Sequence, residues 1–95
     1  MAEIALAFAK TGNAQEADNL MRRVLSMDKN NVNFIYEQAQ INALLGRQAE
    51  ALKALKEAFE KHFPAEYAAG DEDLTTLRTT PEFVGLVKKY SAKKP

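Results

Sequence analysis

Two glycine-containing segments of this 95-residue chain match each other at a separation of 34 residues. The first covers residues 12–17 (GNAQEA) and the second covers residues 46–51 (GRQAEA). Each lies between two stretches with helically spaced apolar residues, and glycine commonly ends a helix because it adopts a left-handed conformation without penalty. The identities at this separation are Glu3/Glu37, Ala5/Ala39, Ala9/Ala43, Gly12/Gly46, Glu16/Glu50 and Ala17/Ala51. The spacing therefore predicts two copies of a two-helix unit, with small residues where the helices cross.

The rest of the chain also follows helical patterns. The expected helices cover about residues 2–10, 14–27, 32–45, 48–62 and 65–69, a short stretch after the acidic residues 71–73, and a last helix from residue 81. Asn13 is suited to cap the second helix, and an asparagine of the polar break at residues 28–31 is suited to cap the third. Thr80-Pro81-Glu82 is a strong start signal for the last helix. No segment alternates apolar and polar residues as a strand does. The predicted fold class is all-α.

Composition and charge exclude several classes of protein. The chain has 46% hydrophobic residues, which is a folding composition, and its 13 basic and 13 acidic residues cancel. No global field therefore favours nucleic acid or a membrane surface. No apolar run reaches the roughly 20 residues of a membrane helix, and the N-terminus lacks the basic start of a signal peptide. The expected location is the cytoplasm.

The repeat resembles the tetratricopeptide family, whose period is also 34 residues with two helices per unit. Alanines stand at that family's small-residue positions, and Phe8 falls at its aromatic. The second unit departs from the pattern, because Ile35, Gln38 and Asn42 stand where tryptophan, leucine and tyrosine are usual. The resemblance implies a right-handed helical solenoid in one domain over residues 1–90. Its parts would be a first repeat (1–30), a second repeat (31–64) and capping helices (65–90), followed by a disordered tail (91–95).

The last third is similar to the segment that closes tetratricopeptide arrays in large bacterial regulatory proteins. It reads DLTTLRTTPEF over residues 73–83. An atypical terminal unit covers the apolar face that a last repeat leaves open. Leu74, Leu77, Phe83 and Val87 are suited to pack on Phe59, Phe63 and Tyr67. The chain would then be the C-terminal end of an array from a longer protein.

The sequence gives little indication of a catalytic or metal-binding site. His62 is the only histidine and there is no cysteine, so we expect no catalytic group, no metal site and no cofactor. The acids Asp71, Glu72 and Asp73 lack the spacing of a calcium loop and indicate helix capping instead. Lys88, Lys89, Lys93 and Lys94 make a basic end, which we interpret as solvated, with weak contact to an acidic partner or nucleic acid as the alternative. The sequence thus predicts a protein that is not an enzyme.

A binding role rests on the groove that the first helix of each repeat would line. Asn33, Tyr36, Gln40 and Leu44 share one helical face and Glu37 is adjacent, while Leu6 and Lys10 would neighbour them from the first helix. Amides beside an aromatic ring suit an extended peptide, and ordinary exposed polar surface is an equal alternative. The lysine and asparagine pairs that capture chaperone carboxylate tails are absent, since Ala2 and Leu6 stand at the first such pair.

The function expected from the sequence is protein–protein interaction through this groove. The alternative is structural: an apolar surface around Ile4 and Phe8 would stack on preceding repeats or make the protein a homo-oligomer. The expected partner is a protein or peptide, with no nucleic acid and no membrane.

Overall fold

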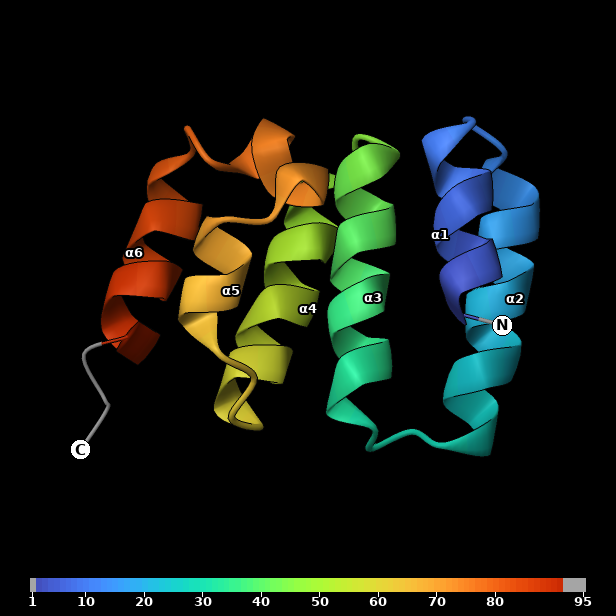
Figure 1. Ribbon diagram of the computed structural model, residues 1–95, viewed down its shortest axis with the longest axis horizontal. Coiled ribbons are helices and arrows are strands. Elements are labelled where there is room, and N and C mark those ends of the chain that lie inside the picture. Colours follow the sequence, from blue (N-terminus) through green and yellow to red (C-terminus); the bar gives the residue numbers. More distant parts are fainter. Residues whose placement is uncertain (1, 92–95) are drawn as a thin grey trace.

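The predicted all-α fold class is confirmed (Figure 1). The computed structural model describes residues 2–91, which form six α-helices and one 3-10 helix and contain no strand within that range. The elements are α1 (Ala2–Lys10), α2 (Ala14–Met27), α3 (Val32–Leu44), α4 (Gln48–Glu60), α5 (Ala65–Ala69), the 3-10 helix η1 (Glu72–Leu77) and α6 (Pro81–Ser91).

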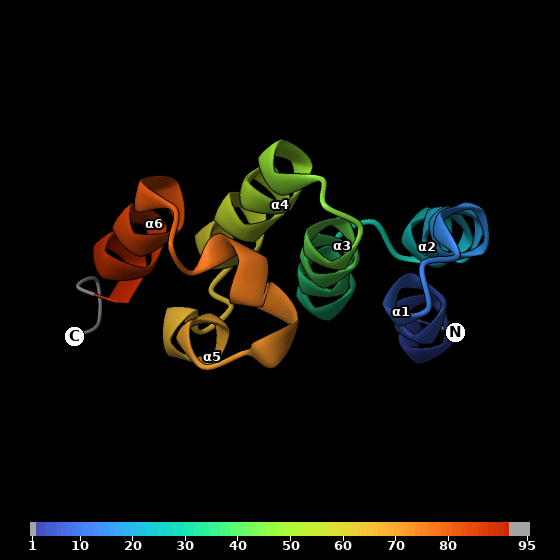
Figure 2. The ribbon, with the colours of Figure 1, turned by 90° about the horizontal axis from the view of Figure 1, so that it is seen from above.

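The helices lie in two layers. Seen from above in Figure 2, α1, α3 and α5 form one row, and α2, α4 and α6 form the other. The pairs α1–α2 and α3–α4 are antiparallel hairpins, and η1 packs against α3. The helices run across the longest dimension of the molecule, which measures 37 × 27 × 18 Å.

The two matching glycine segments form the same turn. Gly12 and Gly46 have φ angles of 83° and 79°, in the left-handed region where glycine is favoured. The amide N–H of Asn13 donates to the carbonyl of Phe8, and the N–H of Arg47 donates to the carbonyl of Asn42, each over 2.8 Å. This bond from the residue after the glycine closes the end of a helix and satisfies one of its free carbonyls.

Alanine lets the paired helices approach closely. Of the six alanines at repeated positions, Ala5, Ala17, Ala39, Ala43 and Ala51 are 0% exposed and Ala9 is 3% exposed. Larger buried side chains fill the remaining space in two hydrophobic clusters. The first joins α1 and α2 to Ile41 of α3, and the second joins the other face of α3 to α4, α5, η1 and α6. Helix α3 therefore contributes to both clusters.

The C-terminal third packs on the second hairpin through most of the predicted residues, although Tyr67 is 61% exposed and lies outside the cluster. Leu74 and Leu77 are fully buried and Phe83 is 4% exposed, and all three lie in one cluster with Leu55 and Phe59 of α4. Helix α6 starts at the expected signal, because its backbone N–H at Phe83 donates to the Thr80 hydroxyl over 3.3 Å. Such a cap satisfies one of the free donors of the first turn.

Three local expectations change. Helix α4 ends at Glu60 and not at residue 62, because His62 takes a left-handed φ of 76° and so occupies the position that glycine fills after α1 and α3. The segment after the acidic residues is a 3-10 helix. Ser91, which the predicted tail included, belongs to α6 instead, and the rest of that tail (residues 92–95) lies outside the described part of the chain, as does Met1.

None of the helices in the described part of the chain has the length and apolar character needed to cross a membrane.

Replacing Ala51 with leucine should lower the free energy of unfolding by roughly 1–3 kcal/mol, because extra methylenes would be forced into a fully buried helix crossing. Chemical denaturation measures the loss. Ala49→Leu on the exposed side of the same helix is the matched control and should change stability by less than about 0.5 kcal/mol. Equal effects of the two substitutions would contradict the close approach of α4 to its neighbours.

Candidate functional site

The candidate partner site lies on the layer formed by α1 and α3. Its seven predicted residues differ widely in exposure. Lys10 and Asn33 are exposed, Tyr36 and Gln40 are buried, and Leu6, Glu37 and Leu44 are half-buried. The structure therefore places them on neighbouring helices but leaves only part of the set open to a partner.

Asp71, just before η1, contacts two of these residues on α3. One of its carboxylate oxygens accepts hydrogen bonds from the Tyr36 hydroxyl (2.6 Å) and from the Gln40 amide (2.7 Å). The other oxygen accepts from the backbone N–H of Asp73 over 2.9 Å, which is the capping role expected from the sequence. Burial and the bond to Asp71 raise the pKa of Tyr36 well above its usual range, so its hydroxyl stays a donor. The chain's own capping segment thus contacts the two side chains predicted to meet a partner.

Aromatic stacking holds the same region together. The Tyr36 ring lies parallel to Phe63 with 3.9 Å between centroids, and Tyr67 meets both rings edge-on at 5.7 Å. Such offset and edge contacts add about 0.5–1.5 kcal/mol per pair beyond the area buried. Tyr67 is nonetheless 61% exposed, so it lies at the edge of this aromatic cluster.

The first hairpin also contacts the capping segment. Lys10 of α1 lies 3.6 Å from a carboxylate oxygen of Asp73, with the lysine side chain 53% exposed. An exposed pair of this kind contributes little, about 0–1 kcal/mol. It nevertheless means that three of the seven predicted residues, Lys10, Tyr36 and Gln40, have partners in residues 71–73.

The side chains of Glu37 and Asn33, by contrast, have no such partner in residues 71–73. One carboxylate oxygen of Glu37 is shielded from solvent and has no hydrogen-bond partner among residues 2–91. Burial and, to a smaller extent, the charge of Glu3 on α1 raise the pKa of Glu37. Asn33 lies one turn away on the same helical face and is exposed. Leu6 and Leu44, by contrast, pack on the core of the first hairpin.

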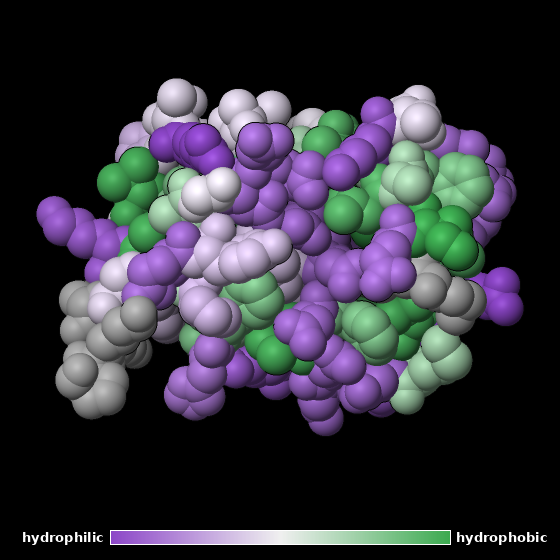
Figure 3. Space-filling model, in the orientation of Figure 1, coloured by the Kyte–Doolittle hydropathy of each residue, from purple (hydrophilic) through white to green (hydrophobic). Residues whose placement is uncertain are grey.

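Figure 3 shows this layer of the molecule from the outside. Hydrophilic side chains run over α3 in the centre of the view, and hydrophobic side chains gather over α1 beside it. Of the two residues of the predicted apolar surface, Ile4 of α1 is 54% exposed, whereas Phe8 is half-buried and packs on the core of the first hairpin. The face is therefore amphipathic, with an apolar helix next to a polar one.

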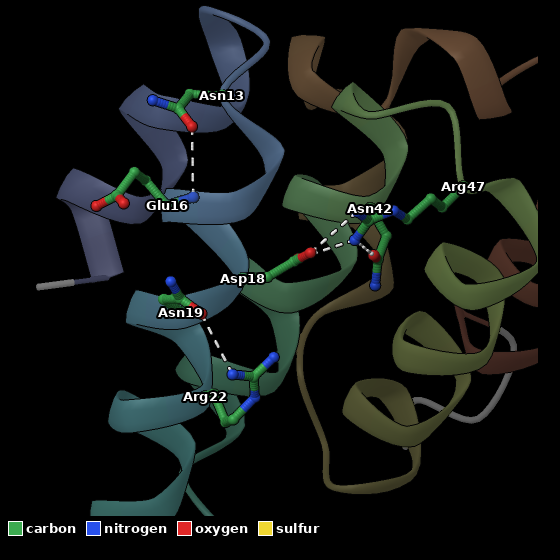
Figure 4. Close-up of polar contacts among 7 residues, drawn as sticks. All are labelled: Asn13, Glu16, Asp18, Asn19, Arg22, Asn42 and Arg47. Atoms are coloured by element: carbon green, nitrogen blue, oxygen red, sulfur yellow. Dashed lines mark hydrogen bonds and ion pairs between the residues drawn. The ribbon is translucent and has the colours of Figure 1, made fainter.

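A contact that the sequence analysis missed joins the two hairpins on the opposite layer (Figure 4). Arg47, between α3 and α4, donates two hydrogen bonds to the carboxylate of Asp18 on α2, over 2.8 and 3.0 Å. Arg47 stands at the position that Asn13 holds one repeat earlier, where the asparagine side chain caps α2 by accepting from the Glu16 N–H. Helix α4 has no side-chain cap. The sequence indicated this contact in one way: the second turn has an arginine, Arg47, at the position where the first turn has Asn13.

Other candidate groups stay apart. Within residues 2–91 no three His, Cys, Asp or Glu side chains come close enough to hold a metal ion. His62 is exposed after the end of α4, and Lys88 and Lys89 are exposed on α6. Lys93 and Lys94, the other half of the predicted basic end, lie outside the described residues.

Removing the Asp71 carboxylate should lower the free energy of unfolding by roughly 2–3 kcal/mol, because the buried Tyr36 hydroxyl and Gln40 amide lose their acceptor. Asp71→Ala tests this by chemical denaturation, with Glu72→Ala as the exposed neighbouring control. Asp71→Asn keeps one acceptor oxygen and should lose less. If Asp71→Ala were as stable as Glu72→Ala, Asp71 would not hold the capping segment to α3.

Comparison with models of known protein families gives a match over nearly the whole chain. The family model described as A/B hydrolase-like, N-terminal domain, matches residues 2–94. Searches of curated proteins and of solved structures find no significant match to the chain.

This match corrects the tetratricopeptide assignment, including the resemblance of residues 73–83 to an end-of-array segment. The assignment was wrong because its identities are not specific to one family. Small residues at crossings and glycine at helix ends are what any closely packed pair of helical hairpins requires. The match also overturns the expectation that the protein is not an enzyme, since that expectation rested on residues of this helical part alone. The chain belongs to the family of A/B hydrolase-like N-terminal domains.

Proposed function

We propose that this chain is the helical domain of a hydrolase-family protein and that it binds a protein or peptide segment on the face formed by α1 and α3. In α/β-hydrolases the nucleophile is displayed on a turn that follows a strand of a central sheet. Residues 2–91 form helices only, so they do not build such a sheet. A role beside the hydrolase-like part, as a binding domain, is the one that this surface supports.

The observation that carries the proposal is that one carboxylate oxygen of Glu37 is buried without a hydrogen-bond partner among residues 2–91. A carboxylate oxygen that is shielded from both water and donors lowers stability, and a donor supplied from outside would remove that penalty. The carboxylate can turn about its last side-chain bond, a torsion with a broad energy profile, and so bring either oxygen towards a ligand. A lysine or arginine side chain of the bound segment would pair with Glu37 and also relieve its repulsion with Glu3.

The neighbouring groups fit the same segment. Asn33 offers an amide that donates to and accepts from an extended backbone, and the apolar surface around Ile4 offers a platform for side chains. Tyr36 and Gln40 hold Asp71 in place at the edge of this surface. The bound segment would lie across α1 and the first half of α3, beside the capping segment.

We also propose that the two hairpins stack as successive turns of a right-handed helical solenoid. The support is their equivalence: the same turn hydrogen bond occurs after Phe8 and after Asn42, and the same alanines are buried 34 residues apart. A solenoid of this kind presents the first helix of each hairpin on one continuous face.

Peptide-display selection against the chain tests the partner site. Peptides recovered with the wild-type protein should be enriched in lysine and arginine, and Glu37→Gln should weaken their binding about tenfold, as loss of a charged hydrogen bond does. Lys53→Ala, an exposed change on the opposite layer, is the control and should leave binding unchanged. Recovered peptides that bind Glu37→Gln as tightly as the wild type would refute the site. Light scattering over the same concentrations separates peptide binding from self-association through Ile4.

Stability should fall as the pH rises through the titration of Glu37. Its pKa is raised in the folded state, so the native protein binds more protons than the unfolded chain above the ordinary glutamate pKa of about 4.3. The stabilising contribution is complete below that value and is lost as the pH passes the folded-state pKa. Glu37→Gln should remove this slope and raise stability at pH 7 by less than about 1 kcal/mol, since the carboxyl group is only partly buried. Chemical denaturation from pH 3 to 8 measures this pH dependence of stability. Glu16→Gln, at an exposed position of α2, is the control.

A further inference from the structure

A cavity lies on the layer opposite the proposed partner face, at the seam between the two hairpins. Its volume is about 460 Å³, within the range of roughly 300–1,000 Å³ that small-molecule sites occupy. Three elements line it: α2 and the turn after it, α3, and α4. No residue of the candidate partner site belongs to its lining.

The sequence of α2 explains why this seam is hollow at one end. Asp18, Arg22, Leu25 and Lys29 follow one another at intervals of four, three and four residues, so they lie along one side of the helix and the turn beyond it. At one end of the seam Asp18 meets Arg47, which closes the space between the hairpins. Figure 4 shows Arg22 on α2, one turn further from this contact. There the cavity opens, with Ala54 and Glu57 of α4 in its lining.

The floor of the cavity is apolar and one wall is cationic. Leu25, Ile35 and Ala54 contribute hydrocarbon surface from three helices. Arg22 and Lys29 stand on the α2 side, and neither forms an ion pair with another residue of the part of the chain that the structure describes. The guanidinium of Arg22 donates one hydrogen bond, to Asn19 over 3.2 Å, which leaves most of its five donors unused.

The other wall determines how a ligand would be oriented. Glu57 of α4 is the one acidic residue that lines the cavity, and it faces the seam from the side opposite the two cations. The Gln38 amide of α3 lies between the walls and forms no hydrogen bond within residues 2–91. A single negative charge is therefore favoured at the α2 wall and disfavoured at the α4 wall.

We propose that this cavity binds a monocarboxylate with an apolar body. The carboxylate pairs with Arg22 and Lys29, for which arginine offers a two-pronged geometry that fits both oxygens. The apolar body covers Leu25, Ile35 and Ala54, and its burial provides most of the affinity. Glu57 rejects ligands with a second negative charge at the far end. Nothing in this proposal depends on the partner face of α1 and α3.

The test uses sodium octanoate, well below the concentration at which it forms micelles, with 1-octanol as the neutral analogue. Amide chemical shifts of the 95-residue chain should move and saturate around Leu25, Gln38 and Ala54 with octanoate, and octanol should bind about tenfold more weakly. Arg22→Gln should weaken octanoate binding about five- to tenfold, whereas Glu57→Gln should strengthen it because it removes the repulsion at the α4 wall. Arg23→Gln, on the neighbouring exposed position of α2, is the matched control.

Three results would overturn the proposal: no saturable shifts, equal binding of octanol and octanoate, or shifts centred on Ile4 of α1 in place of the cavity. Arg22 is exposed and makes no core contact, so Arg22→Gln should fold, and its circular dichroism spectrum confirms this before titration. A loss of octanoate binding in Glu57→Gln would likewise contradict the charge arrangement. Failure here would leave the peptide-binding proposal untouched, since Glu37→Gln alone reports on that face.

Discussion

The carboxylate of Asp71 joins the C-terminal third of the molecule to the centre of the fold. Its two oxygens accept from Tyr36, from Gln40 and from the backbone of Asp73, so one residue joins α3 to the start of η1. Buried donors need an acceptor, and hydrogen bonds to a charged group are stronger than neutral ones. The apolar residues that follow, Leu74 and Leu77, are then directed into the core of the second hairpin.

This arrangement has a consequence for binding. The residues best suited by type to meet a peptide, an aromatic with an amide one turn away, already serve an internal contact. The α1–α3 face keeps one carboxylate oxygen without a donor among residues 2–91, one exposed amide and an apolar helix surface. The proposed ligand of this face is for that reason a segment that brings a positive charge. On the opposite layer the charges at the cavity differ, since Arg22 and Lys29 line it there and form no ion pair within residues 2–91.

Much of the fold followed from the sequence because it depends on local rules. The glycine turns, the asparagine caps and the Thr80-Pro81 start are determined by a few neighbouring residues, and all were found where expected. Apolar packing of residues 74–83 on Phe59 was predicted, but the polar contacts between distant residues were not. Asp71 was recognised as a helix cap, but its long-range role depends on where η1 meets α3, which no spacing rule gives. The family was misassigned for a related reason: alanines and glycines report how closely helices pack and not from which family the helices come.

Because helix α3 contributes to both hydrophobic clusters, its position affects how the domain unfolds. Ile41 belongs to the cluster of the first hairpin, while Ile35 and Tyr36 on its other side belong to the cluster that reaches α6. Arrays of hairpins are often divisible, because each unit contacts only its neighbours and can melt in turn. Here a shared helix lies inside both clusters, so neither can lose its packing without exposing part of the other. The domain should therefore unfold in a single cooperative transition, with subglobal opening confined to its outer helices.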